Sequence, residues 1–241
     1  MVKEIISKAN PQIKDALRLK LKKNRDNIFL IEGERFVIEA IRRRIKINTL
    51  FYVKEPSFLN KLNCECFKIT NEIADALSST INTSGVFAII EYQAKDFVEP
   101  KGNFLVLDRI SDPGNLGTLI RTALAFDFKD IYLYNCVDWR NDKVLRSTMG
   151  TIFDVNLIEC SLEQMFQLKN KNLYVADMDG LDIEIIEKTY PIGLILGNEA
   201  NGVLPEIKDN INNKVKIQMK NEVESLNVAV AGAILMSKLA N

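Results

Sequence analysis

The stretch with the strongest bearing on the fold is residues 222–236, Glu-Val-Glu-Ser-Leu-Asn-Val-Ala-Val-Ala-Gly-Ala-Ile-Leu-Met. After Leu226 the only polar residue is Asn227, and most of the other side chains are small. This pattern predicts a buried core or subunit-interface helix, with Ser225 at the N-cap position. Its apolar run of about 11 residues falls well short of the ~20 that cross a bilayer, so no membrane span is expected. Buried polar groups need hydrogen-bond partners, so Ser225 and Asn227 suggest a ligand-holding loop, with an ordinary capped core helix as the alternative.

Two earlier stretches share this character, because each is a turn rich in Gly and Asn between an apolar strand and a helix. They are residues 112–121, Asp-Pro-Gly-Asn-Leu-Gly-Thr-Leu-Ile-Arg, and residues 196–202, Leu-Gly-Asn-Glu-Ala-Asn-Gly. Neither has the Gly-x-Gly-x-x-Gly order of a dinucleotide site, and the chain has no Gly-Lys-Ser/Thr of a P-loop, which disfavours both kinds of nucleotide site. Polar residues still gather at the strand ends and helix starts: Asn115, Arg121, Asn198, Glu199, Ser225 and Asn227.

The C-terminal part, residues 103–241, alternates short apolar runs with helical segments. Strands are predicted at residues 104–107, 131–134, 155–158, 173–176, 192–196 and 215–217. The alternation predicts an α/β domain with a mostly parallel sheet covered on both faces. Ligands of such sheets bind at the carboxyl ends of the strands, which is where the Gly- and Asn-rich turns are expected.

The N-terminal part, residues 1–95, alternates in the same way and predicts a small α/β domain. Helices are expected at residues 11–25, 34–44 and 71–78, and strands at residues 29–31, 50–53, 66–69 and 86–91. Residues 92–102 contain Pro100 and Gly102 without clear periodicity, and we interpret them as a linker.

Charge is spread unevenly along a chain whose net charge is zero. Residues 1–50 carry 13 Lys and Arg against 6 Asp and Glu, and the remainder carries 19 against 26. This basic N-terminal part suggests a polyanion such as RNA as a partner, although solvated helix faces produce similar asymmetries. The candidate RNA-binding residues, which would contact phosphates rather than bases, are Arg18, Lys22, Lys23 and Arg25.

The absence of histidine from all 241 residues excludes Ser-His-Asp and Cys-His nucleophile pairs and His-based metal sites. The chemistry must therefore use other side chains, main-chain groups or a cofactor. The four cysteines form no Cys-x-x-Cys pair, so reduced thiols are expected and no metal site is predicted. No stretch has the features of a signal peptide, and we expect a cytoplasmic protein.

Taken in order, residues 112–121, 196–202 and 222–236 resemble the three signature motifs of the SpoU (TrmH) family of RNA 2'-O-ribose methyltransferases, in the knotted SPOUT superfamily. Ala200 stands where the second motif often has glycine, which is a mild departure. In the N-terminal part, Lys8-Ala9-Asn10-Pro11 with the basic helix, and then Phe29-Leu30-Ile31-Glu32-Gly33, resemble the RNA-substrate-binding domain that often precedes these catalytic domains. That domain is L30e-like, with the fold of small RNA-binding ribosomal proteins.

The resemblance implies a SPOUT domain with a deep trefoil knot that binds S-adenosylmethionine, and a homodimer formed through the knotted domain. It implies catalytic roles, including shaping of the pocket, for Arg121, Asn115, Glu199, Ser225 and Asn227. It implies cofactor contacts, chiefly through main-chain groups, for Leu196, Gly197, Asn198, Gly202, Ile217 and Leu226.

The expected activity is S-adenosylmethionine-dependent methylation of a ribose 2'-hydroxyl in structured RNA, with ribosomal RNA favoured over transfer RNA. A non-catalytic RNA-binding protein that keeps the knot is the alternative, and a nucleotide-binding α/β regulator is a third possibility. Arg121 matches the residue associated with activation of the hydroxyl. Because a guanidinium stays protonated, we expect it to bind the adjacent phosphate and stabilise negative charge on the oxygen, while phosphate or water accepts the proton.

Overall fold

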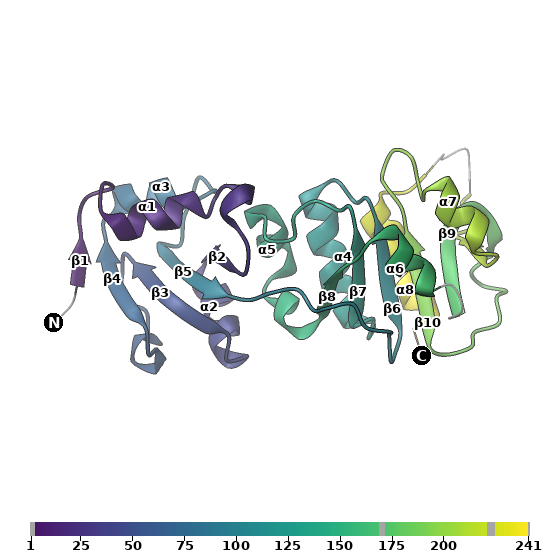
Figure 1. Ribbon diagram of the computed structural model, residues 1–241, viewed down its shortest axis with the longest axis horizontal. Coiled ribbons are helices and arrows are strands. Elements are labelled where there is room, and N and C mark those ends of the chain that lie inside the picture. Colours follow the sequence, from purple (N-terminus) through teal and green to yellow (C-terminus); the bar gives the residue numbers. More distant parts are fainter. Residues whose placement is uncertain (1–2, 169–171, 221–224, 241) are drawn as a thin grey trace. The chain divides into compact units, whose positions relative to one another are not determined.

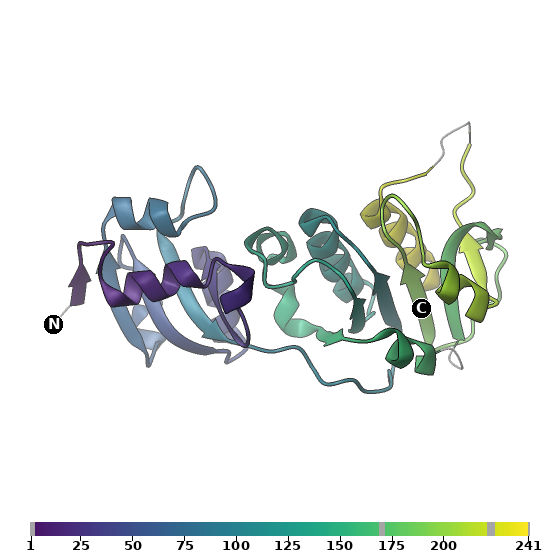
Figure 2. The same cartoon turned by 45° about the horizontal axis from the view of Figure 1, so that its top comes forward.

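The computed structural model describes residues 3–168, 172–220 and 225–240, so residues 222–224 of the C-terminal motif lie outside the described residues. The chain divides into two compact units, each shown in Figures 1 and 2. Unit 1 comprises Met1–Gln93 with Arg140–Phe153, and unit 2 comprises Ala94–Trp139 with Asp154–Asn241. A short segment from the middle of the C-terminal part therefore packs with the N-terminal residues.

Unit 1 contains a five-stranded mixed sheet with the order β1-β4-β3-β5-β2. Its strands are β1 (Lys3–Ile5), β2 (Ile28–Glu32), β3 (Lys46–Tyr52), β4 (Glu65–Ile69) and β5 (Val86–Glu91). Its helices are α1 (Pro11–Arg18), α2 (Glu34–Arg42), α3 (Asn71–Leu77) and α5 (Asp142–Thr148). Helices α1 and α3 lie together on one face of the sheet (Figure 1), where Ile13 and Ile73 join Phe51 and Phe87 in the buried core.

The helix predicted over residues 11–25 ends at Arg18, so the prediction was wrong for its second half. The chain continues into a short 3-10 helix, η1 (Lys22–Asn24). The side chain of Asn24 donates to the carbonyl of Arg18 at 2.8 Å, and Nε of Arg25 donates to the carbonyl of Leu19 at 2.8 Å. These side chains satisfy the carbonyls that further helical turns would use, and the α-helix stops there.

Helix α5 and the residues after it pack within unit 1. The ring of Phe153 lies 5.4 Å from that of Phe36 and 5.3 Å from that of Tyr92, measured between ring centroids. The hydroxyl of Tyr92 donates to the carbonyl of Ile152 at 3.2 Å. The segment 140–153 is therefore part of the core of unit 1.

Unit 2 contains a six-stranded sheet with the order β11-β9-β10-β6-β7-β8, and all its neighbouring strands are parallel. Its strands are β6 (Phe104–Asp108), β7 (Asp130–Tyr134), β8 (Asn156–Glu159), β9 (Asn172–Asp182), β10 (Ile192–Leu196) and β11 (Lys214–Lys216). Its helices are α4 (Pro113–Ala125), α6 (Leu162–Gln167), α7 (Pro205–Asn210) and α8 (Val228–Leu239). The predicted mixed α/β architecture with a parallel C-terminal sheet is confirmed, whereas the trefoil knot stays a prediction.

Helices α4 and α8 pack closely against each other and against β10. A Cβ atom at Gly232 of α8 would lie 2.5 Å from Cδ2 of Leu119 and 2.7 Å from Cδ1 of Leu196. The opposite face of the sheet carries α6 and α7, whose Met165 and Ile207 are fully or almost fully buried. The small residues of α8 thus allow the close helix approach that its sequence indicated.

The start of α8 differs from the prediction, because its N-cap is Asn227 and not Ser225. Oδ1 of Asn227 accepts the main-chain N–H groups of Ala229 at 2.9 Å and Val230 at 3.3 Å. The helix also buries one face only, since the side chain of Val230 is 49% exposed. An amide at position 227 reaches the first free N–H groups, which the Ser225 hydroxyl, two residues earlier, does not cap.

The segment interpreted as a linker belongs to unit 2 from Ala94 onward. The N–H of Lys95 donates to the carbonyl of Leu157 at 2.7 Å, and the hydroxyl of Tyr132 donates to the carbonyl of Val98 at 2.7 Å.

No helix among the described residues is long and apolar enough to span a membrane.

Candidate active site

Two adjacent strands bring the first two Gly- and Asn-rich turns together. Strands β6 and β10 are parallel neighbours, and Leu107 pairs with Leu196 at their carboxyl ends. After β6 the chain enters α4, and Asp112 caps this helix by accepting the main-chain N–H of Asn115 at 2.9 Å. The start of α4 therefore lies beside the turn that follows β10.

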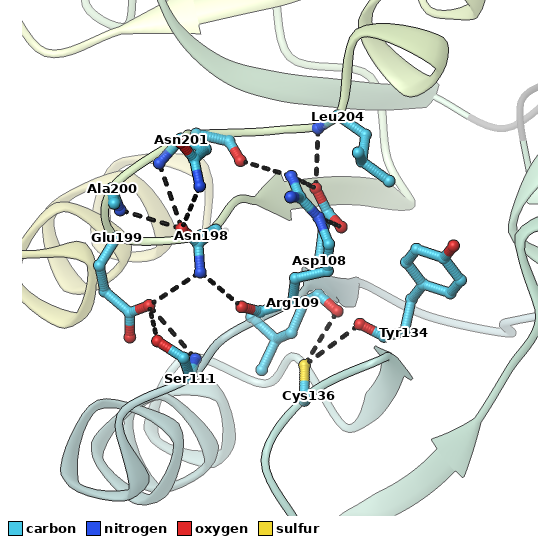
Figure 3. Close-up of polar contacts among 12 residues, drawn as sticks. Asp108, Arg109, Ser111, Tyr134, Cys136, Asn198, Glu199, Ala200, Asn201 and Leu204 are labelled. Atoms are coloured by element: carbon cyan, nitrogen blue, oxygen red, sulfur yellow. Dashed lines mark hydrogen bonds and ion pairs between the residues drawn. The ribbon is translucent and has the colours of Figure 1, made fainter.

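The carboxylate of Glu199, in the turn after β10, accepts several hydrogen bonds from residues at the start of α4 and just before it. Figure 3 shows those from Ser111. Oε2 accepts the N–H of Ser111 at 3.2 Å and its hydroxyl at 2.8 Å. Oε1 accepts the N–H of Asp112 at 3.1 Å and Nδ2 of Asn115 at 3.0 Å. One side chain of the second motif thus binds two residues of the first motif and Ser111 directly before it.

Asn115 extends this network to α8. Its Oδ1 accepts Nδ2 of Asn227 at 3.0 Å, and Asn227 in turn caps α8. One hydrogen-bonded chain therefore runs from Glu199 through Asn115 and Asn227 to the N-terminus of α8. It joins all three stretches that the sequence analysis identified.

The hydrogen bonds set the protonation state of Glu199. Partial burial raises the pKa of this carboxyl, but the hydrogen bonds from Asn115, Ser111 and Asp112 outweigh that effect and lower the pKa to about 2. Glu199 is consequently ionised at neutral pH, where it accepts hydrogen bonds and is too weak a base to take a proton from a hydroxyl.

The lowered pKa predicts a specific dependence of stability on pH. The carboxyl has a pKa of 4.5 as a free group and about 2 in the folded protein, so the unfolded chain binds its proton first as pH falls. The stabilising contribution of Glu199 is complete above pH 4.5 and disappears as pH falls towards 2. We expect Glu199→Gln to destabilise unit 2 at pH 6, and the difference from wild type to shrink between pH 4.5 and 2.5.

The measurement is urea unfolding followed by the fluorescence of Trp139, the single tryptophan of the chain, which lies in unit 2. Asp209→Asn is the control, because Asp209 is exposed on α7 of the same unit and does not line the cavity. A wild-type minus Glu199→Gln difference that stayed constant over this pH range would contradict the assigned ionisation.

The turn from Gly197 to Gly202 is held in a fixed shape by its own main chain. Asn198 and Gly202 exchange two main-chain hydrogen bonds of 3.0 and 2.9 Å, and Oδ1 of Asn198 accepts the N–H of Ala200 at 3.0 Å. A Cβ atom at Gly197 would lie 2.2 Å from both the carbonyl carbon of Gly202 and the nitrogen of Val203. Only glycine therefore fits at position 197.

Asp108 and Arg109 secure the same turn from β6, and the sequence analysis did not identify them (Figure 3). The fully buried Asp108 carboxylate accepts Nε of Arg109 at 2.8 Å and the N–H of Leu204 at 2.8 Å. Arg109 also donates from Nη2 to the carbonyl of Gly202 at 3.1 Å, and its own carbonyl accepts Nδ2 of Asn198 at 2.9 Å. A carboxylate directly after the apolar run 104–107 was the signal that could have indicated this role.

A cavity of about 400 Å³ adjoins the network. Its lining includes every predicted cofactor residue and three predicted catalytic residues: Leu196, Gly197, Asn198, Gly202, Ile217, Leu226, Glu199, Ser225 and Asn227. The middle of β9 adds Ala176, Asp177 and Met178, which the sequence analysis missed. They lie at or just after the end of the predicted strand 173–176. Among the described residues, no cluster of three or more Cys, Asp or Glu side chains could hold a metal ion.

The cavity fits S-adenosylmethionine in size and chemistry. Small-molecule sites usually enclose about 300–1,000 Å³ and combine apolar walls with a few polar groups. Here Leu196, Leu226 and Leu235 supply apolar walls suited to an adenine ring, and the main chain of the fixed turn and Asn227 supply polar groups. The glycines of the turn let the main chain form part of the wall.

The structure does not bring Arg121 to this cavity. Arg121 lies on the exposed side of α4 with Thr118, and neither residue lines the cavity. Within the described part of the chain, no residue forms a hydrogen bond or ion pair with the Arg121 guanidinium. The predicted catalytic set is therefore divided between the network at the cavity and one exposed cation.

The predicted RNA-binding residues differ in their exposure. Arg18, Lys22 and Lys23 are exposed, and the Arg18 guanidinium bonds only to Asp15, at 3.3 Å, among the partners described. The side chain of Arg25 is 6% exposed, and it donates to the carbonyls of Leu19 and Lys20. Burial of this guanidinium in the loop argues against direct contact between Arg25 and RNA.

Comparison with known proteins agrees with this geometry. Residues 102–237 match the SpoU rRNA Methylase family, and residues 10–88 match the MRM3-like substrate binding domain. The chain is 31% identical to the 23S rRNA (guanosine(2553)-2'-O)-methyltransferase RlmP of Bacillus subtilis, with 99% of both chains covered. It also resembles the crystal structure of an rRNA methyltransferase from Sinorhizobium meliloti, with TM-score 0.90, 27% identity, and coverage of 99% of this chain and 97% of that one.

A second structure of the Sinorhizobium meliloti enzyme, with AdoMet bound, has the same TM-score and coverage. AdoMet is S-adenosylmethionine, the cofactor predicted for the cavity. The chain therefore belongs to the SpoU rRNA Methylase family, and its predicted RNA 2'-O-methyltransferase activity and S-adenosylmethionine cofactor are confirmed.

Proposed function

We propose that this protein transfers a methyl group from S-adenosylmethionine to a ribose 2'-hydroxyl of ribosomal RNA. The observation that carries the proposal is the hydrogen-bonded chain from Glu199 through Asn115 to Asn227, beside a cavity lined by the predicted cofactor residues. The name of RlmP, which describes methylation of a guanosine of 23S ribosomal RNA, supports ribosomal over transfer RNA. The individual residue roles are part of this proposal.

S-adenosylmethionine supplies an electrophilic methyl group, so the chain must align the reactants and help the hydroxyl lose its proton. Alignment alone is worth about 7–11 kcal/mol in well-oriented reactions. Glu199, Asn115 and Asn227 hold the three motif stretches in one arrangement and thereby fix the cavity wall. Arg121 binds the phosphate next to the target ribose and stabilises the negative charge that develops on the ribose 2'-oxygen. Phosphate or water takes the proton.

The two ends of the chain have different tasks in this proposal. Residues 1–95 form the RNA-substrate-binding domain, with Arg18, Lys22 and Lys23 as phosphate contacts, and residues 103–241 form the methyltransferase domain. The match of residues 10–88 to a substrate binding domain and the basic composition of residues 1–50 support this assignment. The location that we propose is the cytoplasm.

We further propose a homodimer formed through the methyltransferase domain, with the trefoil knot of the SPOUT superfamily. The apolar surface that α8 leaves exposed at Val230, and the small residues along this helix, support a close subunit contact. Arg121 is exposed on α4, the helix that packs against α8, so the partner subunit or the RNA can reach it. Analytical ultracentrifugation of wild type and Val230→Asp tests the dimer, since a buried carboxylate in the contact should favour the monomer.

The competing function, a non-catalytic RNA-binding protein with the same fold, is disfavoured because every predicted cofactor residue lines the cavity. The test compares methyl transfer from labelled S-adenosylmethionine to unmodified 23S ribosomal RNA and to unmodified transfer RNA. We expect incorporation into ribosomal RNA. Cofactor binding without transfer to either RNA would favour the non-catalytic alternative, and absence of cofactor binding would refute the enzyme.

A further inference from the structure

The most exposed large apolar side chain of the described residues lies in unit 1. Ile81 is 100% exposed in the loop between α3 and β5, where its neighbours are Ser, Thr and Asn. An isoleucine in full contact with water contributes nothing to the stability of its own fold. Because single exposed apolar residues are common on protein surfaces, the contacts of the surrounding loop decide whether Ile81 has a role.

The loop is held by Glu32, the half-buried last residue of β2. The Glu32 carboxylate accepts the hydroxyl of Ser78 at 2.6 Å and the N–H of Ser79 at 3.3 Å. The Thr80 hydroxyl donates to the carbonyl of Asn82 at 3.1 Å. The residues on both sides of Ile81 are therefore joined by a hydrogen bond, and the isoleucine projects from a defined main-chain shape.

A second loop, residues 19–25, is tied to the first. Nζ of Lys20 donates to the carbonyl of Ser78 at 2.7 Å and to that of Ala76 at 3.3 Å. This loop exposes Lys22 and Lys23, and next to them Leu21 is 55% exposed. The two loops together, which we call the loop pair (residues 19–25 and 78–83), combine exposed cations with exposed apolar side chains.

Asp142 of α5 braces both loops at once. Its Oδ2 accepts the hydroxyl of Ser79 at 2.5 Å, and its Oδ1 lies 3.8 Å from Nη2 of the buried Arg25. Asp142 belongs to the segment 140–153, which lies within the stretch matched by the methylase family but packs in unit 1. The carboxylates of Glu32 and Asp142 are thus engaged inside the loop pair, and its exposed charges include Lys22 and Lys23.

We propose that the loop pair binds structured RNA at an unpaired nucleotide, with Ile81 covering the face of the exposed base and Lys22 and Lys23 contacting the adjoining phosphates. Proteins recognise RNA mainly at loops and bulges, where bases are accessible, and apolar side chains insert between or against bases in nucleic-acid complexes. Lysine contacts add salt-dependent affinity without sequence information. The inference rests on the proposed function, because it concerns how the RNA substrate docks.

The test uses the full-length protein with unmodified 23S ribosomal RNA transcribed in vitro. Ile81→Ser should raise the KM for RNA roughly tenfold, and leave kcat and the KM for S-adenosylmethionine unchanged. Ile185→Ser is the matched control, because Ile185 is 72% exposed in unit 2 and lies outside the loop pair. The double variant Lys22→Ala/Lys23→Ala should lower the slope of log affinity against log salt concentration by the amount expected for about two phosphate contacts. Ile81→Ser should leave this slope unchanged.

Two further measurements separate this inference from the activity itself. A photoreactive benzoylphenylalanine at position 81 should crosslink to a nucleotide that is unpaired in the RNA secondary structure. Asp142→Asn should weaken RNA binding at unchanged cofactor affinity, with unfolding curves to show that unit 1 stays folded. Wild-type RNA affinity in Ile81→Ser while methyl transfer proceeds would overturn the loop pair and leave the enzyme intact, whereas no transfer by wild type would overturn the enzyme itself.

Discussion

Arg121→Ala is expected to lower the rate of methyl transfer about 10²- to 10³-fold, the effect of removing one donor that stabilises a developing negative charge. Binding of S-adenosylmethionine should not change, because Arg121 does not line the cavity. The decrease should appear in kcat, with an added rise in the KM for RNA if the guanidinium also holds a phosphate. Single-turnover rates with saturating cofactor, together with calorimetric cofactor affinity, measure the two effects separately.

The controls for Arg121 come from the same helix. Thr118→Ala alters the same exposed side of α4 and should be close to wild type. Arg121→Lys keeps the charge and loses the planar fork, so we expect only a small part of the rate to return. Wild-type kcat and an unchanged pH-rate profile in Arg121→Lys would argue against contacts between the planar guanidinium of Arg121 and the phosphate or the oxyanion.

Gly197→Ala is expected to abolish most cofactor binding. A Cβ atom at this position meets main-chain atoms of Gly202 and Val203 at 2.2 Å, and those atoms are fixed by the hydrogen bonds of Asn198 and Asp108. Overpacking of a fixed site costs about 1–3 kcal/mol, which corresponds to a loss of roughly 5- to 150-fold in affinity if the strain is released by opening the cavity wall. Calorimetric titration with S-adenosylmethionine measures this directly.

Gly102→Ala provides the matched control, because an added Cβ at Gly102 meets no atom within 4 Å. The unfolding midpoint of both variants should be measured alongside, since strain at Gly197 can also lower stability. Cofactor affinity in Gly197→Ala equal to that of wild type would show that the turn rearranges freely, which contradicts the fixed wall.

The sequence was sufficient to predict the parallel sheet and the parts of the site that follow its strands. The apolar run 192–196 coincides with β10, and the run 104–107 lies within β6. The Gly- and Asn-rich turns that carry Asn115 and Glu199 were expected at the carboxyl ends of the strands. The hydrogen bond of 3.0 Å between these two side chains agrees with that expectation.

Details that depend on side-chain geometry were not predictable. Ser225 and Asn227 are both good N-cap residues, and only the path of the chain places the amide of Asn227 at the free N–H groups. The basic run after Arg18 has helical spacing, yet Asn24 and Arg25 cap the carbonyls of the preceding turn and end the helix. Helix propensity and spacing alone could not reveal which of these local side-chain hydrogen bonds would form.

Sequence patterns also could not predict how the chain divides into its two units. Nothing in the periodicity of residues 140–153 distinguishes a helix that packs on the parallel sheet from one that packs on β2 of unit 1. The same limit applies to Asp108, whose importance depends on hydrogen bonds to Arg109 and Leu204. Contacts between residues distant in sequence decide both features.

The most direct test of the central claim is the position of the transferred methyl group. Wild-type protein is incubated with unmodified 23S ribosomal RNA and S-adenosylmethionine labelled in its methyl group, and the RNA is digested completely to nucleosides. We predict that the label elutes with a 2'-O-methylribonucleoside and that Arg121→Ala gives almost none. Label on a base, or bound cofactor with no transfer to the RNA, would contradict the assignment of this protein as a ribosomal RNA 2'-O-methyltransferase.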